Sequence, residues 1–135
     1  MSAPPSHTRI KICGLTREQD VDAAVEAGAD AIGFVLYPRS PRAVTVERAA
    51  ELALRLPPFV TPVLLFVNED PADSTRALAA IPGAIAQFHG DETPELCRAG
   101  SGSGRHRFIR AARIPLGPAG IDFVLLKHAQ DFSDA

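Results

Sequence analysis

The sequence predicts an α/β fold in which five strands alternate with five helices along the chain. Short apolar runs rich in Ile, Val, Leu and Phe alternate with segments whose apolar residues recur at helical spacing. Nothing else interrupts this alternation, and each strand–helix unit takes about 25 residues. This order predicts a parallel sheet whose strands are joined by right-handed crossovers.

Five segments have the composition of strands. Residues 62–67 (PVLLFV) are apolar on both faces, which is typical of a strand buried in a parallel sheet. Residues 9–13 (RIKIC) alternate polar and apolar side chains and run into a Gly turn. The expected strands are residues 9–13, 30–36, 62–67, 84–89 and 107–114.

Capping residues mark where the helices between these strands begin. Thr45, Thr93 and the pair Asp70 and Pro71 are expected to start three helices, and Thr16 is expected to cap the first one. The expected helices are residues 17–28, 46–56, 71–81, 94–99 and 120–132.

Two segments are expected to lack helix and strand. Residues 1–8 are rich in Pro and Ser and read as a disordered tail, which leaves residues 9–135 as one domain. Residues 100–104 (GSGSG) are expected to form a flexible connector. They precede a strand, whereas phosphate-binding loops follow a strand and open a helix.

The composition excludes several classes of partner. The 135 residues carry a formal net charge of −2, which gives no electrostatic basis for binding nucleic acid or an anionic membrane. No apolar run approaches the roughly 20 residues that a membrane-spanning helix needs. The two cysteines, Cys13 and Cys97, form no CxxC pair, so a reduced, cytoplasmic protein is expected.

The arrangement of polar residues on the strands favours a (β/α)8 barrel over a doubly wound open sheet. No G-x-G-x-x-G motif follows the first strand. Side chains alternate across a strand, so Lys11 shares a face with Cys13, and Gln87 shares a face with His89. These four side chains can point into one barrel interior while the apolar set meets the helices.

The thiol at the end of the first strand is the leading candidate for a reactive group. Cys13 lies where α/β enzymes place their catalytic residues, at the carboxyl end of a parallel strand. The pKa of a free thiol, near 8.5, must be lowered for it to act as a base at neutral pH, and the charge of Lys11 can contribute to this. The alternative is a small buried apolar residue, the usual role of a free Cys, and Cys97 is assigned that role.

Four motifs together resemble the phosphoribosylanthranilate isomerase family of tryptophan biosynthesis. They are KICGLT at 11–16, GFVLYPRSPR at 33–42, FVNED at 66–70 and QFHGDE at 87–92, and the resemblance extends over residues 9–132. It implies a (β/α)8 barrel that uses neither a metal nor an organic cofactor. It also implies an Amadori rearrangement, which converts N-(5-phosphoribosyl)anthranilate to 1-(2-carboxyphenylamino)-1-deoxyribulose 5-phosphate.

The resemblance assigns roles to four residues. Cys13 matches the general base of the family, with Lys11 beside it as a substrate-binding residue. Arg42 matches the residue that binds the anthranilate carboxylate, and a planar guanidinium suits that group. His89 is expected to line the substrate site. Without the resemblance, Arg42 reads as a solvated loop residue and His89 as a residue that orders the rim.

Two parts of the family's site have no match in these 135 residues. The general acid of the family is an Asp at the end of the sixth strand, and the substrate phosphate is bound by glycine-rich loops after the seventh and eighth strands. Five strands cannot close an eight-stranded barrel, so open edges that invite self-association are expected. The sequence therefore predicts a truncated barrel with little or no activity alone.

Two alternatives remain open. The chain can be a non-catalytic half-barrel that pairs with a second copy or with a complementary fragment. It can also be another barrel enzyme that binds ribulose-type phosphates, although the pair of Cys13 and Arg42 fits a sugar that bears an aminobenzoate.

Overall fold

The computed structural model describes residues 6–115, 117–118 and 120–134, in which five parallel strands form one sheet. The strands lie in chain order, and each pairs with the next. The strands are β1 (Lys11–Cys13), β2 (Ala31–Val35), β3 (Thr61–Phe66), β4 (Ile85–Phe88) and β5 (Phe108–Arg110). The helices are α1 (Glu18–Glu26), α2 (Val46–Ala53), α3 (Pro71–Ala80), α4 (Pro94–Gly100) and α5 (Phe123–Gln130), followed by a 3-10 helix, η1 (Asp131–Asp134).

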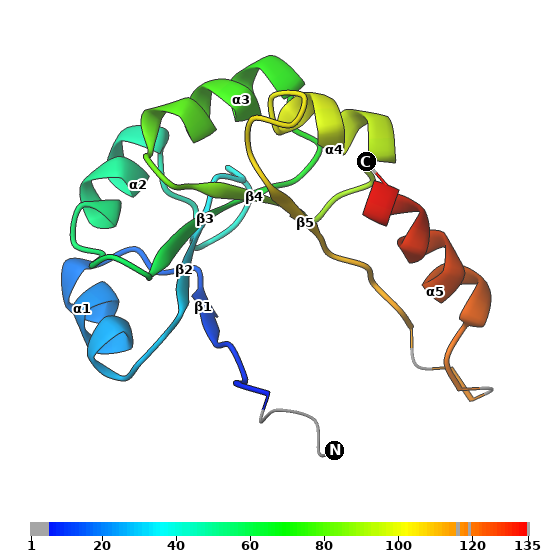
Figure 1. Ribbon diagram of the computed structural model, residues 1–135, viewed down its shortest axis with the longest axis horizontal. Coiled ribbons are helices and arrows are strands. Elements are labelled where there is room, and N and C mark those ends of the chain that lie inside the picture. The colour runs from blue at the N-terminus through cyan, green and yellow to red at the C-terminus, as the bar shows by residue number, and fades with distance from the viewer. Residues whose placement is uncertain (1–5, 116, 119, 135) are drawn as a thin grey trace.

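The sheet is curved, and helices α1 to α4 lie along its outer side (Figure 1). The buried core fills the space between this side of the sheet and the helices. It contains Ile32, Phe34, Leu64, Phe66, Ala86 and Phe88 from the strands and Val21, Ala49, Leu52, Ala77, Leu78 and Cys97 from the helices. The α/β fold that the sequence predicts, a truncated barrel of five parallel strand–helix units, is confirmed.

The register defines a second face of the sheet, which we call the inner face because it points away from the helices. Ile12 pairs with the core residue Ile32, so the next pair, Cys13 and Gly33, points to the inner face. The same alternation places Gln87, the neighbour of the core residue Phe88, on the inner face. The inner face is therefore where the polar strand residues gather.

Three of the four predicted helix caps are confirmed. The side chains of Thr45 and Thr93 accept hydrogen bonds from the backbone N–H three residues on, at 3.1 and 3.2 Å, and Asp70 accepts one from Ala72 at 2.8 Å. The prediction for Thr16 is wrong, since α1 begins at Glu18 and the chain is still extended at Arg17.

Two loop predictions differ from the structure. The last strand was expected to reach residue 114, but β5 ends at Arg110, where β4, its only partner among the described residues, also ends. The predicted flexibility of residues 100–104 is wrong at its start, because Gly100 and Ser101 are buried. The Gly100 carbonyl accepts a 2.8 Å hydrogen bond from Ser74 Oγ, which joins the end of α4 to α3.

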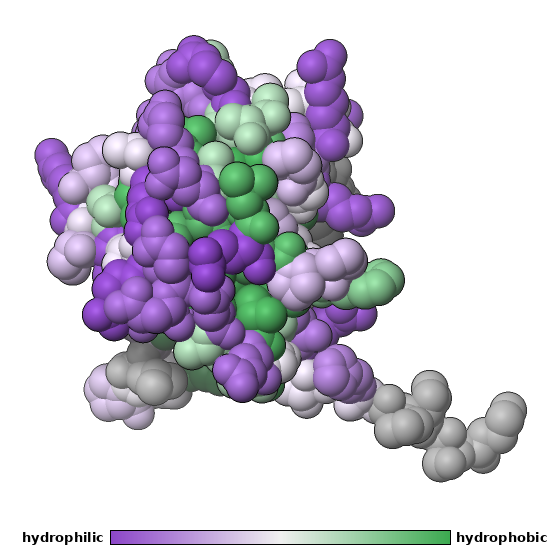
Figure 2. Space-filling model, turned by 90° about the vertical axis from the view of Figure 1, so that its left-hand side faces the viewer, coloured by the Kyte–Doolittle hydropathy of each residue, from purple (hydrophilic) through white to green (hydrophobic). Residues whose placement is uncertain are grey.

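The two edges of the sheet expose apolar side chains. In the described part of the chain, β1 and β5 each have one neighbouring strand, and Ile10, Ile12 and Ile109 are 49%, 38% and 42% exposed. On the side of α1 and α2, hydrophilic side chains cover most of the surface and a strip of hydrophobic ones shows between them (Figure 2).

The expected tail falls mostly outside the described residues. Residues 1–5 are not described, and residues 6–8 carry neither helix nor strand. No helix in the ranges given above has the length and apolar character needed to cross a membrane.

Candidate active site

The carboxyl ends of the strands and the loops after them surround a hollow of about 770 Å³. Side chains from the segments that follow β2, β3, β4 and β5 line it, because the carboxyl ends of parallel strands meet at one edge of a sheet. Its polar lining includes Arg42, Asn68, His89, Glu92 and Arg110. The structure thus brings together two of the residues that the sequence singled out, Arg42 and His89.

Cys13 lies beside this hollow and does not line it. It is the last residue of β1, is partly buried, and pairs with Gly33 on the inner face. A Cβ atom on Gly33 would lie 2.7 Å from Cys13 Sγ, so the absence of a side chain at Gly33 makes the space that the thiol occupies. Lys11 lies two residues back on the same face, also outside the lining of the hollow.

Arg42 lines the hollow and also contacts the backbone of Cys13. Its Nη1 donates a 2.9 Å hydrogen bond to the backbone carbonyl of Cys13. The guanidinium lies against Gly14, where a Cβ atom would come within 2.6 Å of Arg42 Cζ. Gly14 also has a φ of +85°, which an L side chain rarely adopts. A guanidinium has five N–H donors, so this contact leaves donors available for an anionic group in the hollow.

His89 is held at the rim in its neutral form. Its backbone N–H donates to the Phe66 carbonyl at 2.9 Å, which continues the β3–β4 pairing. Burial, followed by the positive charges of Arg113, Arg110 and Lys11, lowers the pKa of His89 below its usual 6.5. The imidazole is therefore neutral at pH 7 and able to donate or accept one hydrogen bond.

Gln87 is the polar neighbour of His89 on the inner face. Its Nε2 lies 3.5 Å from His89 Nδ1, and its side chain is almost fully buried. Its Oε1 is buried without a hydrogen-bond partner among the described residues. An unpaired buried oxygen is costly, so this amide is a polar group held inside the protein at a cost in stability.

Glu92 is a structural residue of the site that the sequence reasoning missed. Glu92 is only 4% exposed, and its carboxylate accepts 2.8 Å hydrogen bonds from the N–H groups of Asn68 and Gly90. Asn68 Oδ1 in turn accepts from the N–H of Asp91 at 2.8 Å. Together they lock the loop after β3 to the loop after β4. No local pattern predicts a contact between residues 24 positions apart.

The side chain of Arg110 leaves β5 on the helix side of the sheet, and Arg110 also lines the hollow. It pairs in register with the core residue Phe88. Its guanidinium donates to the carbonyl of Gly90 at 2.7 Å and lies 5.1 Å from the centre of the Phe132 ring. Arg110 therefore ties β5 to the loop that follows His89.

The second thiol differs from Cys13 in its surroundings. Cys97 is fully buried in the core, and burial raises its pKa to about 11, so it stays protonated at neutral pH. Within the described ranges, no group of three or more His, Cys, Asp or Glu side chains is placed to hold a metal ion.

A curved parallel sheet with helices on its outer side, and with its polar site at the carboxyl ends of the strands, defines the class of (β/α)-barrel enzymes. The sequence model of the N-(5'-phosphoribosyl)anthranilate isomerase family matches residues 10–112. The chain belongs to this family, so the resemblance drawn from the four motifs is confirmed.

Individual relatives agree with this assignment. N-(5'-phosphoribosyl)anthranilate isomerase of Methylibium petroleiphilum is 62% identical over 128 residues, which are 95% of this chain and 56% of that protein. The isomerase of Leptothrix cholodnii is 57% identical over 135 residues, which are 100% of this chain and 57% of that protein. The chain thus spans slightly more than half the length of these relatives.

Solved structures give the same result. Phosphoribosylanthranilate isomerase from Thermotoga maritima is 35% identical and superposes with a TM-score of 0.84 over 95% of this chain and 58% of that one. A phosphoribosylanthranilate isomerase solved with reduced 1-(o-carboxyphenylamino)-1-deoxyribulose 5-phosphate gives a TM-score of 0.83 at 35% identity, over 95% of this chain and 62% of that one.

Proposed function

We propose that these residues form the amino-terminal part of a phosphoribosylanthranilate isomerase site, which rearranges N-(5-phosphoribosyl)anthranilate to 1-(2-carboxyphenylamino)-1-deoxyribulose 5-phosphate. The observation that supports the proposal is the 2.9 Å hydrogen bond between Arg42, which lines the hollow, and the backbone carbonyl of Cys13, whose thiol lies beside the hollow. A relative of this chain has been solved with a reduced form of that product.

In this proposal, two residues act on two different parts of the substrate: Arg42 on the anthranilate carboxylate and Cys13 on C2′ of the sugar. Free N–H donors of Arg42 bind the anthranilate carboxylate in a bidentate, charge-assisted contact. Once the furanose ring has opened to a protonated imine (iminium), Cys13 as thiolate takes the proton from C2′. The C2′–H electron pair forms the C1′–C2′ double bond, the electron pair of the C1′–N double bond moves onto the nitrogen, and a neutral enol with an enamine nitrogen results. Protonation at C1′ with loss of the proton of the C2′ hydroxyl then gives the aminoketose, so no external oxidant or reductant is needed.

His89 and Lys11 have supporting roles in this proposal. Neutral His89, which lines the hollow, is a polar group available to the sugar hydroxyls. The ammonium of Lys11 favours anionic groups near the inner face. The two free cysteines and the biosynthetic substrate fit a cytoplasmic enzyme.

The proton that opens the furanose ring needs an acid, and the substrate phosphate needs an anchor. We assign neither role to a residue of this chain, because the family places them on later strand–helix units. Loss of a general acid typically costs about 10²–10⁴ in rate. A polypeptide of these 135 residues alone is therefore expected to turn over substrate weakly or not at all.

The test uses a chimaera in which residues 1–135 are joined to the part of the Methylibium petroleiphilum isomerase that lies beyond the match. The rate at which N-(5-phosphoribosyl)anthranilate is consumed is measured for the chimaera and for the 135-residue polypeptide. The proposal predicts turnover by the chimaera of about 10 s⁻¹ and turnover by the polypeptide that is lower by about 100-fold or more. A folded chimaera without activity would refute the proposal.

The second candidate function is a non-catalytic half-barrel that associates with a second copy. The exposed isoleucines Ile10, Ile12 and Ile109 at the two sheet edges favour it, since open parallel edges and apolar surface promote pairing. Size-exclusion chromatography of the same purified polypeptide distinguishes the two. A compact dimer supports pairing, and a monomer excludes it.

A further inference from the structure

The loop that follows Cys13 connects β1 to α1. Two arginines bind backbone carbonyl groups at the two ends of this loop. Arg42 binds the carbonyl of Cys13, and Arg48, in the first turn of α2, binds the carbonyl of Thr16 through Nη2 at 3.2 Å. The N–H of Gly14 also donates to the Gly33 carbonyl at 2.8 Å. The loop is thus tied to the segment that runs from the end of β2 into α2.

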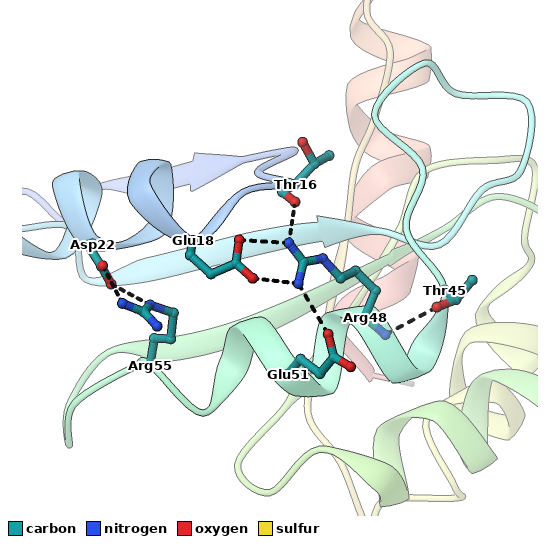
Figure 3. Close-up of polar contacts among 7 residues, drawn as sticks. All are labelled: Thr16, Glu18, Asp22, Thr45, Arg48, Glu51 and Arg55. Atoms are coloured by element: carbon teal, nitrogen blue, oxygen red, sulfur yellow. Dashed lines mark hydrogen bonds and ion pairs between the residues drawn. The ribbon is translucent and has the colours of Figure 1, made fainter.

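Arg48 is fixed in place by two carboxylates (Figure 3). Its Nη1 and Nη2 donate to the two oxygens of Glu18 at 2.6 and 2.9 Å, and Nη1 also donates to Glu51 at 3.1 Å. The hydrogen bonds from Arg48 lower the pKa of Glu18 to about 2, and those from both carboxylates raise the pKa of Arg48. Glu18 and Arg48 are therefore both charged at neutral pH, and the guanidinium stays aimed at the loop.

A second arginine pair joins α1 to the turn that follows α2 without touching the loop. Arg55, two residues after the end of α2, binds both oxygens of Asp22 of α1, at 2.7 and 2.5 Å (Figure 3). Its side chain is 42% exposed against 32% for Arg48. The two arginines make the same kind of bidentate contact with a carboxylate of α1. Arg48 differs in that it also binds Glu51 and holds a backbone carbonyl three residues after Cys13.

We propose that Arg48 is a positioning residue for the Cys13 thiol. It acts through the Thr16 carbonyl: with Arg48 in place, the β1–α1 loop cannot lift from α2, and the thiol stays in the space beside Gly33. Arg42 holds the near end of the loop and Arg48 holds its far end. The catalytic meaning of this role rests on the proposed function, but the restraint on the loop does not.

The test compares Arg48→Met with Arg55→Met in the chimaera. Each variant removes one bidentate arginine–carboxylate pair that holds α1, so a similar fall in Tm is expected from both. The rate of Cys13 alkylation by iodoacetamide is measured by mass spectrometry of the peptide that contains it, together with amide exchange of residues 14–16. We expect Arg48→Met to raise both rates about five-fold or more, and Arg55→Met to leave both within about two-fold. Equal changes in the two variants would overturn the proposal.

Arg48→Lys separates loop positioning from helix pairing. A lysine ammonium can pair with Glu18, but it lacks the planar fork that reaches the carboxylate and the carbonyl together. Arg48→Lys should therefore recover most of the Tm while Cys13 alkylation remains fast. Slow alkylation in this variant would show that the helix ion pair alone restrains the thiol, which contradicts the proposal.

Turnover measurements separate this inference from the proposed function. In an active chimaera, Arg48→Met should lower kcat about ten-fold with KM within about two-fold, because the base is displaced while the carboxylate contact remains. Arg55→Met should change neither constant. An inactive chimaera would refute the proposed function, and the alkylation result would still decide the role of Arg48.

Discussion

Replacing Cys13 by Ala is expected to lower kcat of the chimaera about 10²–10⁴-fold, the range typical for loss of a general base. In the proposed mechanism, the thiolate of Cys13 accepts the proton from C2′ of the sugar. Alanine keeps the strand and the carbonyl that Arg42 binds, so KM should change little. Turnover of the chimaera and of the variant, measured over a range of substrate concentrations, tests this directly.

The matched control is Cys97→Ala. Cys97 is fully buried and its pKa is raised to about 11, so it takes no part in proton transfer at neutral pH. This variant should keep kcat within about two-fold while losing some stability from the small cavity. Equal losses of kcat in the two variants would show that both thiols contribute only through packing, which would contradict the role of Cys13 as the base.

Replacing Phe34 by Ala is expected to lower the free energy of unfolding by about 3–5 kcal/mol. Phe34 is fully buried in the core between the sheet and the helices, and the neighbouring strand places Leu64 beside it. Truncation leaves a cavity that the rigid sheet cannot close. Urea denaturation followed by circular dichroism measures the change.

Phe59→Ala is the control for this substitution because it makes the same chemical change on the surface. Phe59 is 100% exposed, so its truncation should change the free energy of unfolding by less than about 0.5 kcal/mol. A loss at Phe34 no larger than that at Phe59 would mean that the helices do not pack on the sheet as described.

Local sequence signals were sufficient for most of the fold. Apolar runs give strands, and residues with a physical capping role give helix starts, as Thr45, Asp70 and Thr93 show. Thr16 carried a similar signal and failed. The turn at Gly14 keeps the chain extended through Arg17, and the Thr16 carbonyl is held by Arg48 from a different helix. A capping residue predicts a helix start only where the preceding turn allows one.

The site was predicted in part. Alternation along single strands was enough to place Cys13 and Gln87 on one face of the sheet, and the register agrees. The contacts that organise the rim join residues distant in sequence: Arg42 with Cys13, and Glu92 with Asn68. Such pairs depend on how loops from neighbouring strands meet. For this reason the burial of the Glu92 carboxylate could not be predicted from the sequence.

The most direct test asks whether Cys13 lies in the substrate site. Its alkylation rate in the chimaera is measured with and without reduced 1-(o-carboxyphenylamino)-1-deoxyribulose 5-phosphate, the compound bound in a solved relative. At a concentration of about ten times its Kd, the compound should slow alkylation about ten-fold, because only the free protein reacts. An unchanged rate while the compound is bound would place the thiol outside the site and contradict the assignment of Cys13 as the base.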